Sequence, residues 1–156
     1  MCTRVHTSRR VRRAAIASGY MDTLSTEARS RLMSRIKGRD TKPELLVRST
    51  AHRLGLRFRL HDKRLPGKPD LVLPKHRTVI FVHGCFWHGH TCKRGARQPK
   101  DNAAYWRAKI ARNVARDGAS LKTLKQNGWS PLVIWECETR DPVKLSRRIQ
   151  RLTRKT

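Results

Sequence analysis

An apolar run that leads directly into a group of histidines and cysteines limits the folds open to this chain more than any other feature. The run covers residues 78–82, and residues 83–92 follow it with imidazoles, thiols and a Phe-Trp pair. A short continuous apolar run bounded by turn residues predicts a buried strand. We therefore expect the chain to present metal ligands, acid–base groups and stacking side chains together at the end of one rigid element.

Side chains in and beyond this segment predict a structural zinc site. The predicted ligands are Cys85, His90, Cys92 and Cys137. Thiolate and imidazole groups in a closed four-coordinate set are typical of structural zinc, which would hold a long loop against the sheet. His88 competes with His90 for the histidine position, and the alternative for Cys137 is a small buried hydrophobic side chain.

The apolar periodicities predict a mixed α/β domain in which helices cover one mixed β-sheet. We expect helices over residues 25–36, 41–54, 101–115, from there to 126, and from 141 onward. We expect strands over residues 56–60, 70–73, 78–82 and 132–135. Thr41 and Glu44 have the spacing of a capping box, and Gly55 marks the end of the helix that they begin.

The charge of the chain indicates a polyanionic partner. Its 37 Lys and Arg residues against 11 Asp and Glu give a formal net charge of +26, which attracts nucleic acid. The basic residues are spread along the whole chain, and this favours nucleic acid over a membrane surface. No apolar run approaches the ~18 residues that span a bilayer, so we expect a soluble protein.

Residues 1–20 carry arginines and no acid. They could form a basic arm on DNA or a targeting peptide; we favour a disordered tail upstream of a true start at Met21. We expect residues 21–156 to form a single domain. Cysteines that accompany histidines favour metal binding in a reducing compartment, so we expect a cytoplasmic protein.

Four polar side chains are candidates for chemistry, and each has a plainer alternative. Asp70 begins a predicted strand, either as a Mg²⁺ ligand in a phosphodiesterase site or as a turn aspartate that bonds its own backbone. His83 and His88 could act as general base and phosphate contact, or lie in the loop as ordinary hydrogen-bonded histidines. Glu44 could orient a histidine or only cap its helix.

Aromatic side chains accompany these groups. Phe86 and Trp87 fall on the predicted loop, and Tyr105 and Trp106 fall on the helix that follows. Such rings can stack on bases or wedge between them. The alternative is core packing, which we expect for Tyr105 more than for Phe86 and Trp87.

Three motifs, in this order and spacing, resemble the very short patch repair (Vsr) family of DNA mismatch endonucleases. They lie at residues 65–70, 83–88 and 135–137, within a similarity that runs from residue 21 to residue 152. The resemblance implies a restriction-endonuclease-like fold with a structural zinc site. It also implies Mg²⁺-dependent nicking 5′ to the thymine of a T:G mismatch, the product of 5-methylcytosine deamination.

By motif match, the resemblance implies a role for each candidate. Asp70 would bind Mg²⁺ together with the backbone carbonyl of Val82, a position where the family often has Thr. His88 would take a proton from water while His83 stabilises the phosphate, leaving a 5′-phosphate and a 3′-hydroxyl; which histidine is the base stays open. Glu44 would be the acidic partner of His88.

The resemblance also implies the remaining site residues. The zinc ligands would be Cys85, His90, Cys92 and Cys137. The aromatics inserted beside the mismatch would be Phe86, Trp87 and Trp106. The common nuclease pattern of Asp followed by Glu-x-Lys is not met, because residues 81–83 take its place with a histidine, as in the Vsr branch.

Two other functions compete with this one. The first is a related nuclease of the same fold that acts on unmismatched DNA. The second is a catalytically inactive, zinc-stabilised DNA-binding protein. Family membership also implies a MutL-type repair partner and a cognate cytosine-5 methyltransferase, and we expect a monomer. The bases read around the mismatch do not follow from the sequence, because several loops set them.

Overall fold

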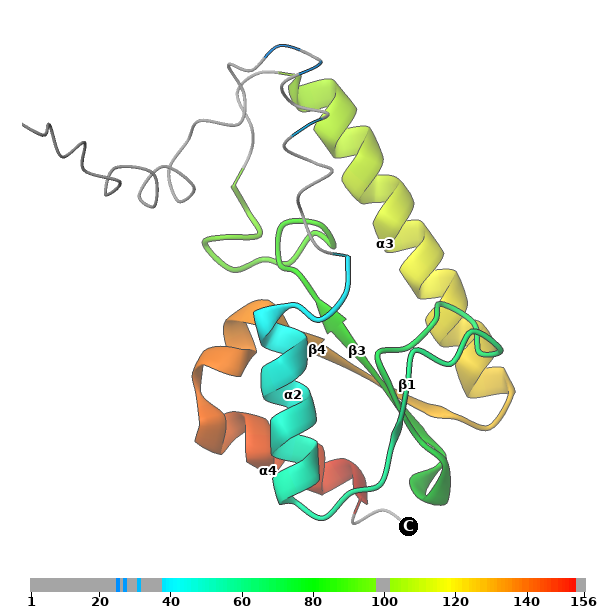
Figure 1. Ribbon diagram of the computed structural model, residues 1–156. Coiled ribbons are helices and arrows are strands. Elements are labelled where there is room, and N and C mark those ends of the chain that lie inside the picture. Colours follow the sequence, from blue (N-terminus) through cyan, green and yellow to red (C-terminus); the bar gives the residue numbers. More distant parts are fainter. Residues whose placement is uncertain (1–24, 26, 28–30, 32–37, 98–101, 154–156) are drawn as a thin grey trace, which may run out of the picture.

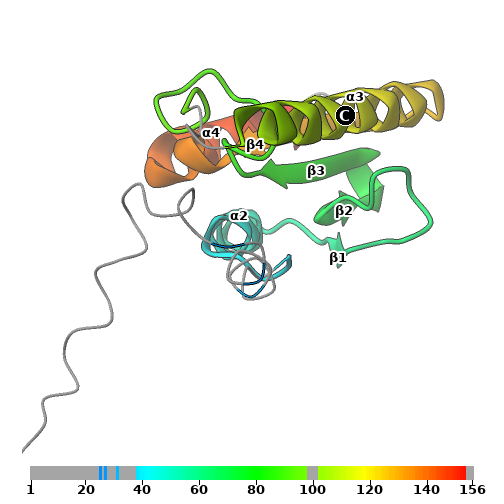
Figure 2. The ribbon, with the colours of Figure 1, turned by 90° about the horizontal axis from the view of Figure 1, so that it is seen from above.

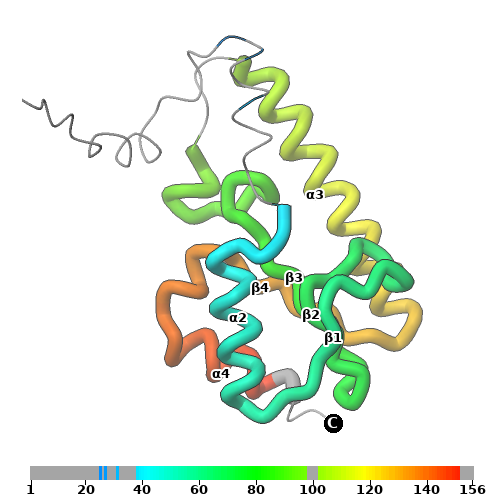
Figure 3. Tube along the Cα trace, in the orientation of Figure 1, coloured from blue at the N-terminus to red at the C-terminus, as the bar shows by residue number. Residues whose placement is uncertain are grey.

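The computed structural model describes residues 25, 27, 31, 38–97 and 102–153 (Figure 1, Figure 3). Its elements are α2 (Lys42–Arg53), β1 (Arg59–Leu60), β2 (Leu71–Leu73), the 3-10 turn η1 (Pro74–His76), β3 (Thr78–His83), α3 (Ala103–Gln126), β4 (Ser130–Trp135), the 3-10 turn η2 (Glu136–Arg140) and α4 (Pro142–Thr153). The predicted tail over residues 1–20 and most of the predicted helix over residues 25–36 lie outside the described residues. Within the described part, no helix is long and apolar enough to cross a membrane.

The predicted mixed sheet is confirmed. Its four strands lie in the order β1-β2-β3-β4, antiparallel from β1 to β3, with β4 joined to β3 in parallel. The side chains of β2 are buried on both faces, and those of β3 are almost all buried. Two covered faces explain why both strands read as continuous apolar runs instead of alternating.

Helices cover both faces of the sheet. Helices α2 and α4 pack on one face and α3 on the other (Figure 1, Figure 2). The first core cluster contains Val47, Ala51, Leu71, Leu73, Ile80, Leu132, Ile134, Leu145 and Ile149. The second contains Val72, Val79, Phe81 and Leu124. The central strands thus have a core on each side, which fixes the end of β3 where the candidate site begins.

The two helices expected over residues 101–115 and onward to 126 are a single helix, so this prediction was wrong. Helix α3 runs without a break through Gly118, which lies in open space. A glycine in a helix interior costs only about 1 kcal/mol, and the packing of Leu121 and Leu124 on the sheet outweighs it. The expected cap, Asp101, lies outside the described residues, and Asn102 is the N-cap.

The strand expected over residues 56–60 is shorter than predicted. Only Arg59 and Leu60 pair with β2, because Leu56 and Phe58 pack against the first core cluster. Alternation alone did not distinguish a paired strand from an extended connection. The predicted helix end is confirmed: α2 ends at Arg53, and Gly55 follows with a φ of 72°.

Candidate active site and metal centre

Three strands bring the candidate residues to one end of the sheet. His83 ends β3 and lies opposite Trp135, which ends the parallel strand β4. Asp70 directly precedes β2, which runs the other way, and its backbone N–H donates to the Ile80 carbonyl at 3.0 Å. Residues that are far apart in the sequence therefore meet at this edge.

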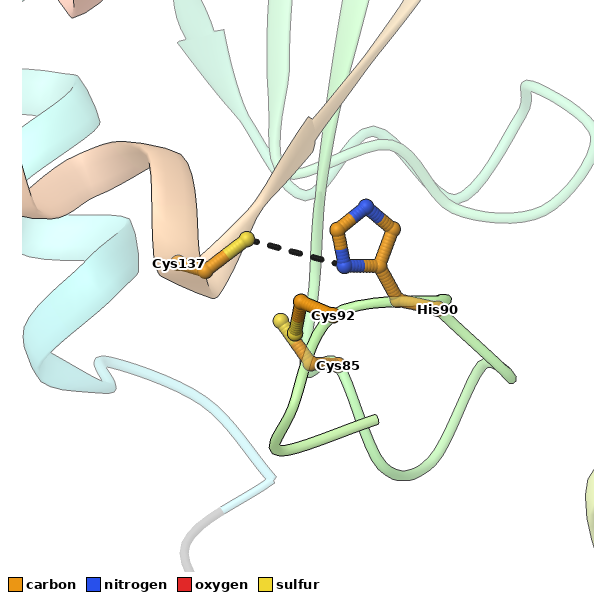
Figure 4. A group of neighbouring side chains, drawn as sticks. All are labelled: Cys85, His90, Cys92 and Cys137. Carbon is orange, nitrogen blue, oxygen red and sulfur yellow. Dashed lines mark hydrogen bonds between the residues drawn. The ribbon is translucent and has the colours of Figure 1, made fainter. Parts of the chain in front are cut away.

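The four predicted zinc ligands come together at that edge. The loop after β3 supplies Cys85, His90 and Cys92, and η2 supplies Cys137. Their ligand atoms all lie within 4.8 Å of one another (Figure 4), and the gap between Cys137 Sγ and His90 Nδ1 is 3.6 Å. The group could therefore hold a metal ion, and a Cys₃His set in this arrangement fits tetrahedral zinc.

The thiols of this group differ in their readiness to ionise. Its hydrogen bond with His90 lowers the pKa of Cys92 to about 6. Burial raises the pKa of Cys85 to about 12 and also raises the pKa of Cys137. A bound cation favours thiolates, so the Cys85 and Cys137 thiols would ionise when a metal binds and not before.

Close backbone packing shapes the loop that carries these ligands. The His90 N–H donates to the Cys85 carbonyl at 3.0 Å, and Ala96 N–H donates to the Cys92 carbonyl at 2.8 Å. A Cβ on Gly95 would lie 2.0 Å from the carbonyl oxygen of His90. Only glycine can lie so close to this carbonyl oxygen, so the loop that spaces the ligands requires Gly95.

A pair of stacked histidines lies beside the four candidate zinc ligands. The rings of His83 and His88 are parallel to within 11°, with centroids 3.9 Å apart. His88 Nδ1 lies 2.5 Å from Asp117 Oδ2, a carboxylate on α3. Burial lowers the pKa of His83 to about 4, so this ring is neutral near pH 7. One histidine is oriented by a carboxylate and the other is neutral and buried.

The Asp70 carboxylate is held in place by the neighbouring strand. Its Oδ2 accepts the backbone N–H of Val82 at 2.7 Å, and its Oδ1 lies 4.0 Å from Nδ1 of His61. Burial raises the pKa of the Asp70 carboxyl. Asp70 is therefore more than a turn aspartate, because its side chain joins β2 to the end of β3.

Glu44 is buried, but its contacts lie within its own region of the chain. Its carboxylate accepts from the Thr41 hydroxyl at 2.7 Å and from the Asp40 backbone N–H at 3.0 Å, and Arg48 lies 3.3 Å away. These bonds resemble a capping box shifted by one residue. The carboxylate that contacts His88 is that of Asp117, and not that of Glu44.

The aromatic side chains form one cluster next to the histidines. Phe86, Trp87 and Trp106 contact one another edge to face, with centroid distances from 5.1 to 5.8 Å. Trp106 is buried beneath the other two, whereas Tyr105, expected in the core, is half exposed. Lys109 Nζ lies 5.5 Å from the Trp87 ring. The expectation for Tyr105 was wrong because its helix turns it outward.

Comparisons with known proteins decide the family. The family model described as "DNA mismatch endonuclease Vsr" matches residues 21–94. The chain is 41% identical over 125 residues to the DNA mismatch endonuclease Vsr of Escherichia coli K12, covering 80% of each chain. The chain belongs to the Vsr family. It is also 47% identical to the type II nicking enzyme V.XorIIP of Xanthomonas oryzae pv. oryzae, over 84% of this chain and 96% of that one.

A third relative of this Vsr family member is the type II nicking enzyme V.NmeAIP of Neisseria meningitidis, 44% identical over 85% of this chain and 94% of that one. The structure also adds residues to the site that sequence reasoning missed: Asp117, His61 and Arg48. Asp117 is the one acid of a long basic helix, which was a weak signal. Spacing gave no sign of His61 or Arg48, because their contacts depend on the packing of α2 against the sheet.

Proposed function

We propose that this chain is a Mg²⁺-dependent DNA mismatch endonuclease that nicks 5′ to the thymine of T:G mismatches left by deaminated 5-methylcytosine. One observation carries the proposal. His88 is bonded to Asp117 and stacked on His83 at the end of the sheet that also presents Asp70. In a member of the Vsr family, this is a hydrolytic site for a phosphodiester.

Asp70 and the backbone carbonyl of Val82 would hold the magnesium ion. The Val82 N–H points to Asp70, and the carbonyl of a strand residue leaves the same edge as its N–H. Two oxygen donors with open positions suit Mg²⁺, which keeps several waters. When bound, the ion neutralises phosphate charge and favours ionised water. A valine therefore serves at this position, since the side chain is not needed.

His88 would be the general base and His83 the phosphate contact. The Asp117 carboxylate can only accept, so it holds the proton of His88 on Nδ1 and leaves Nε2 free to take a proton from water. His83 stacks on this ring and is held at the end of β3. It would donate an N–H to a phosphate oxygen. The expected products are a 5′-phosphate and a 3′-hydroxyl.

The aromatic cluster would select the mismatch. Phe86 and Trp87 are partly exposed beside the histidines, and Trp106 supports them from below. Aromatic wedges open base steps at a cost of a few kcal/mol, which is least where pairing is already weak. We propose that Phe86 and Trp87 enter the stack at the T:G pair while Trp106, which is buried, supports them, and that Glu44 supports the site by fixing the start of α2.

The finer features of the fold and partners are also part of the proposal. The arrangement of helices on both faces of a mixed sheet supports a restriction-endonuclease-like fold, with residues 21–156 as one domain and residues 1–20 as a tail. The donor set supports structural zinc. A MutL-type protein and a cytosine-5 methyltransferase are the partners that family membership suggests.

A nicking assay tests the function directly. Short linear duplexes would carry one T:G pair in a panel of flanking sequences, and the zinc-loaded chain would be added with and without Mg²⁺. We expect a single nick 5′ to the mismatched thymine, on a subset of flanks, only with Mg²⁺. The ends would be identified by ligation and by phosphatase treatment.

The same panel with T:A in place of T:G is the control. Equal nicking of matched and mismatched duplexes would replace the repair function with that of a nuclease for ordinary DNA. Tight binding without nicking on every duplex would show an inactive DNA-binding protein. In that case, loss of binding on zinc removal would be expected, and Asp70→Ala would change nothing.

A further inference from the structure

A partly buried arginine lies where a cation could otherwise bind. Asp40, Glu44 and His61 present ligand atoms close enough to hold a metal ion. Arg48 contacts all three: Nη1 lies 2.5 Å from the Asp40 carboxylate, and Nη2 lies 3.3 Å from Glu44 and 2.9 Å from His61 Nε2. Its side chain is 13% exposed, and its Nε has no hydrogen-bond partner among the described residues. Desolvating a charge in this way is costly, and the three polar partners of Arg48 offset that cost.

The backbone conformation of His61 directs this residue toward Asp70, the proposed magnesium ligand. Its φ is 49°, in the left-handed region that non-glycine residues rarely adopt. Its backbone N–H donates to the Asp70 carbonyl at 3.3 Å, and its ring Nδ1 faces Asp70 Oδ1 at 4.0 Å. Both the main chain and the side chain of His61 are therefore directed at Asp70. Strain of this kind persists where the surroundings fix it, and it gathers at functional sites.

The arginine decides which nitrogen of His61 carries the proton. A guanidinium has only donors, so the His61 Nε2 that faces Arg48 must accept. The ring proton then lies on Nδ1, the nitrogen that faces Asp70. At 4.0 Å this N–H acts on the carboxylate through its partial charge rather than through a direct hydrogen bond.

We propose that Arg48 and His61 are positioning residues that orient the Asp70 carboxylate for the divalent cation. The Val82 N–H holds one oxygen of the Asp70 carboxylate by a hydrogen bond. The Nδ1–H of His61, whose ring contacts Arg48, faces the other oxygen and attracts it electrostatically. Arg48 also fills the Asp40–Glu44–His61 cluster, so the cation binds at Asp70 alone. The inference rests on the proposed function of Asp70 as the metal ligand.

Binding of Mn²⁺, followed by electron paramagnetic resonance on the zinc-loaded full chain, tests the inference without using catalysis. Partners that orient a metal ligand typically contribute about 10- to 100-fold in affinity. We expect Arg48→Met and His61→Ala each to weaken Mn²⁺ binding at Asp70 about tenfold. His61→Asn should restore most of the affinity, because asparagine tolerates the left-handed backbone and its amide places an N–H near the position of Nδ1.

Two further variants make the result unambiguous. Asp70→Ala measures how much Mn²⁺ binding depends on the proposed ligand. The double variant Arg48→Met with Asp70→Ala measures any binding by the Asp40–Glu44–His61 cluster once its arginine is gone, and this contribution is subtracted from that of Arg48→Met. We expect the double variant to show a site that wild type lacks, which would mark Arg48 as the group that excludes a second cation.

The Mg²⁺ dependence of nicking adds a readout that a purely structural role would not change. The Mg²⁺ concentration for half-maximal rate should rise about tenfold in His61→Ala, in step with the weaker binding, while the rate at saturating Mg²⁺ falls much less. Wild-type Mn²⁺ binding by Asp70→Ala would overturn the proposed metal site itself. Loss of binding in Asp70→Ala with full binding in Arg48→Met and His61→Ala would overturn only the positioning role. Failure of His61→Asn to recover affinity would overturn the role of the Nδ1 proton.

Discussion

At the scale of single residues, the contact between His88 and Asp117 is the observation that favours a hydrolytic site over an ordinary group of loop histidines. The carboxylate comes from α3, and the histidine comes from the loop after β3. A carboxylate bonded to one ring nitrogen fixes the tautomer and stabilises the imidazolium that forms when the other nitrogen takes a proton. The four candidate zinc ligands beside it could hold the loop through a metal ion, so the histidine would not have to be positioned by the DNA alone.

Removing the charge of Asp117 should therefore slow nicking more than it weakens DNA binding. We expect Asp117→Asn to lower kcat by about 100-fold or more, the range found for general acid–base groups and their orienting carboxylates. Single-turnover nicking of a T:G duplex would measure the rate, and fluorescence anisotropy would measure binding.

Asp141→Asn is the matched control, because Asp141 has the same charge but accepts from the first turn of α4, outside the site. Asparagine caps a helix about as well as aspartate, so this variant should keep both its stability and its single-turnover rate near those of wild type. An equal rate loss in both variants would mean that general loss of acidic charge, and not the His88 contact, lowers activity.

The sequence predicted which side chains would meet at the end of the sheet but not all of their partners. The four metal ligands and the proximity of Asp70 to the end of β3 follow from motifs that lie at strand ends. The partner of His88 did not follow, because Asp117 lies 29 residues away on a helix whose rotation is set by packing. Local spacing cannot report which face of such a helix meets a loop.

At the scale of elements, two glycines show how differently the same residue can matter. Gly118 lies in the middle of α3 with nothing within 4 Å of the position that a methyl group would occupy, whereas Gly95 lies against the carbonyl of His90. The first keeps a helix slightly weaker than it needs to be. The second is required by the loop that carries the metal ligands.

Gly118→Ala should stabilise the protein. Alanine has a higher helix propensity than glycine, and we expect a gain of about 0.5–1 kcal/mol in the free energy of unfolding. Urea unfolding followed by circular dichroism would measure it. A loss of stability would mean that α3 is bent or crowded at this point, contrary to the open space around Gly118.

Gly95→Ala should have the opposite effect. The added methyl would displace the His90 carbonyl, so we expect a loss of about 1–3 kcal/mol together with most of the bound zinc. Metal content by mass spectrometry and unfolding by urea would be compared with Gly118→Ala, which makes the same chemical change. Full zinc content in Gly95→Ala would show that the loop has room that the structure does not indicate.

Elements were predictable where burial was complete and less so where packing decided their limits. β3 was found because its apolar run is almost entirely buried beneath helices, and β4 because its apolar run includes the buried Leu132 and Ile134. The single helix α3 was missed because the sequence shows the local cost of Gly118 but not the sheet that outweighs it. The same limit applies to β1, whose preceding residues pack on the core instead of pairing.

At the scale of the whole molecule, we expect the net charge to provide affinity for DNA and the aromatic cluster to provide discrimination between matched and mismatched duplexes. The chain carries a net charge of +26, and basic side chains follow one another along α3 and α4. Phosphate contacts are the same for matched and mismatched DNA, so they give affinity without discrimination. We expect the partly exposed members of the aromatic cluster, Phe86 and Trp87, to make the contact that depends on how easily a base step opens.

This division predicts how salt and mismatch should combine. Affinity for DNA should fall about 10³- to 10⁵-fold between roughly 50 and 200 mM salt if six to ten phosphates are contacted. The slope of log affinity against log salt concentration should be the same for T:G and T:A duplexes. The T:G line should lie above the T:A line by a constant offset in log affinity. Trp87→Ala should reduce the offset and leave the slope unchanged, whereas Arg112→Ala, on exposed α3 surface, should reduce the slope by about 1 and leave the offset.

Anisotropy titrations at several salt concentrations would give slope and offset for each variant. If Trp87→Ala changed the slope, the aromatic cluster would be contributing to phosphate contacts instead of opening the base stack. If T:G and T:A differed in slope, the two duplexes would be bound in different registers, and charge would then contribute to discrimination. Parallel lines with a separation that depends on Trp87 would place discrimination at the loop that carries the candidate zinc ligands, beside His83 and His88.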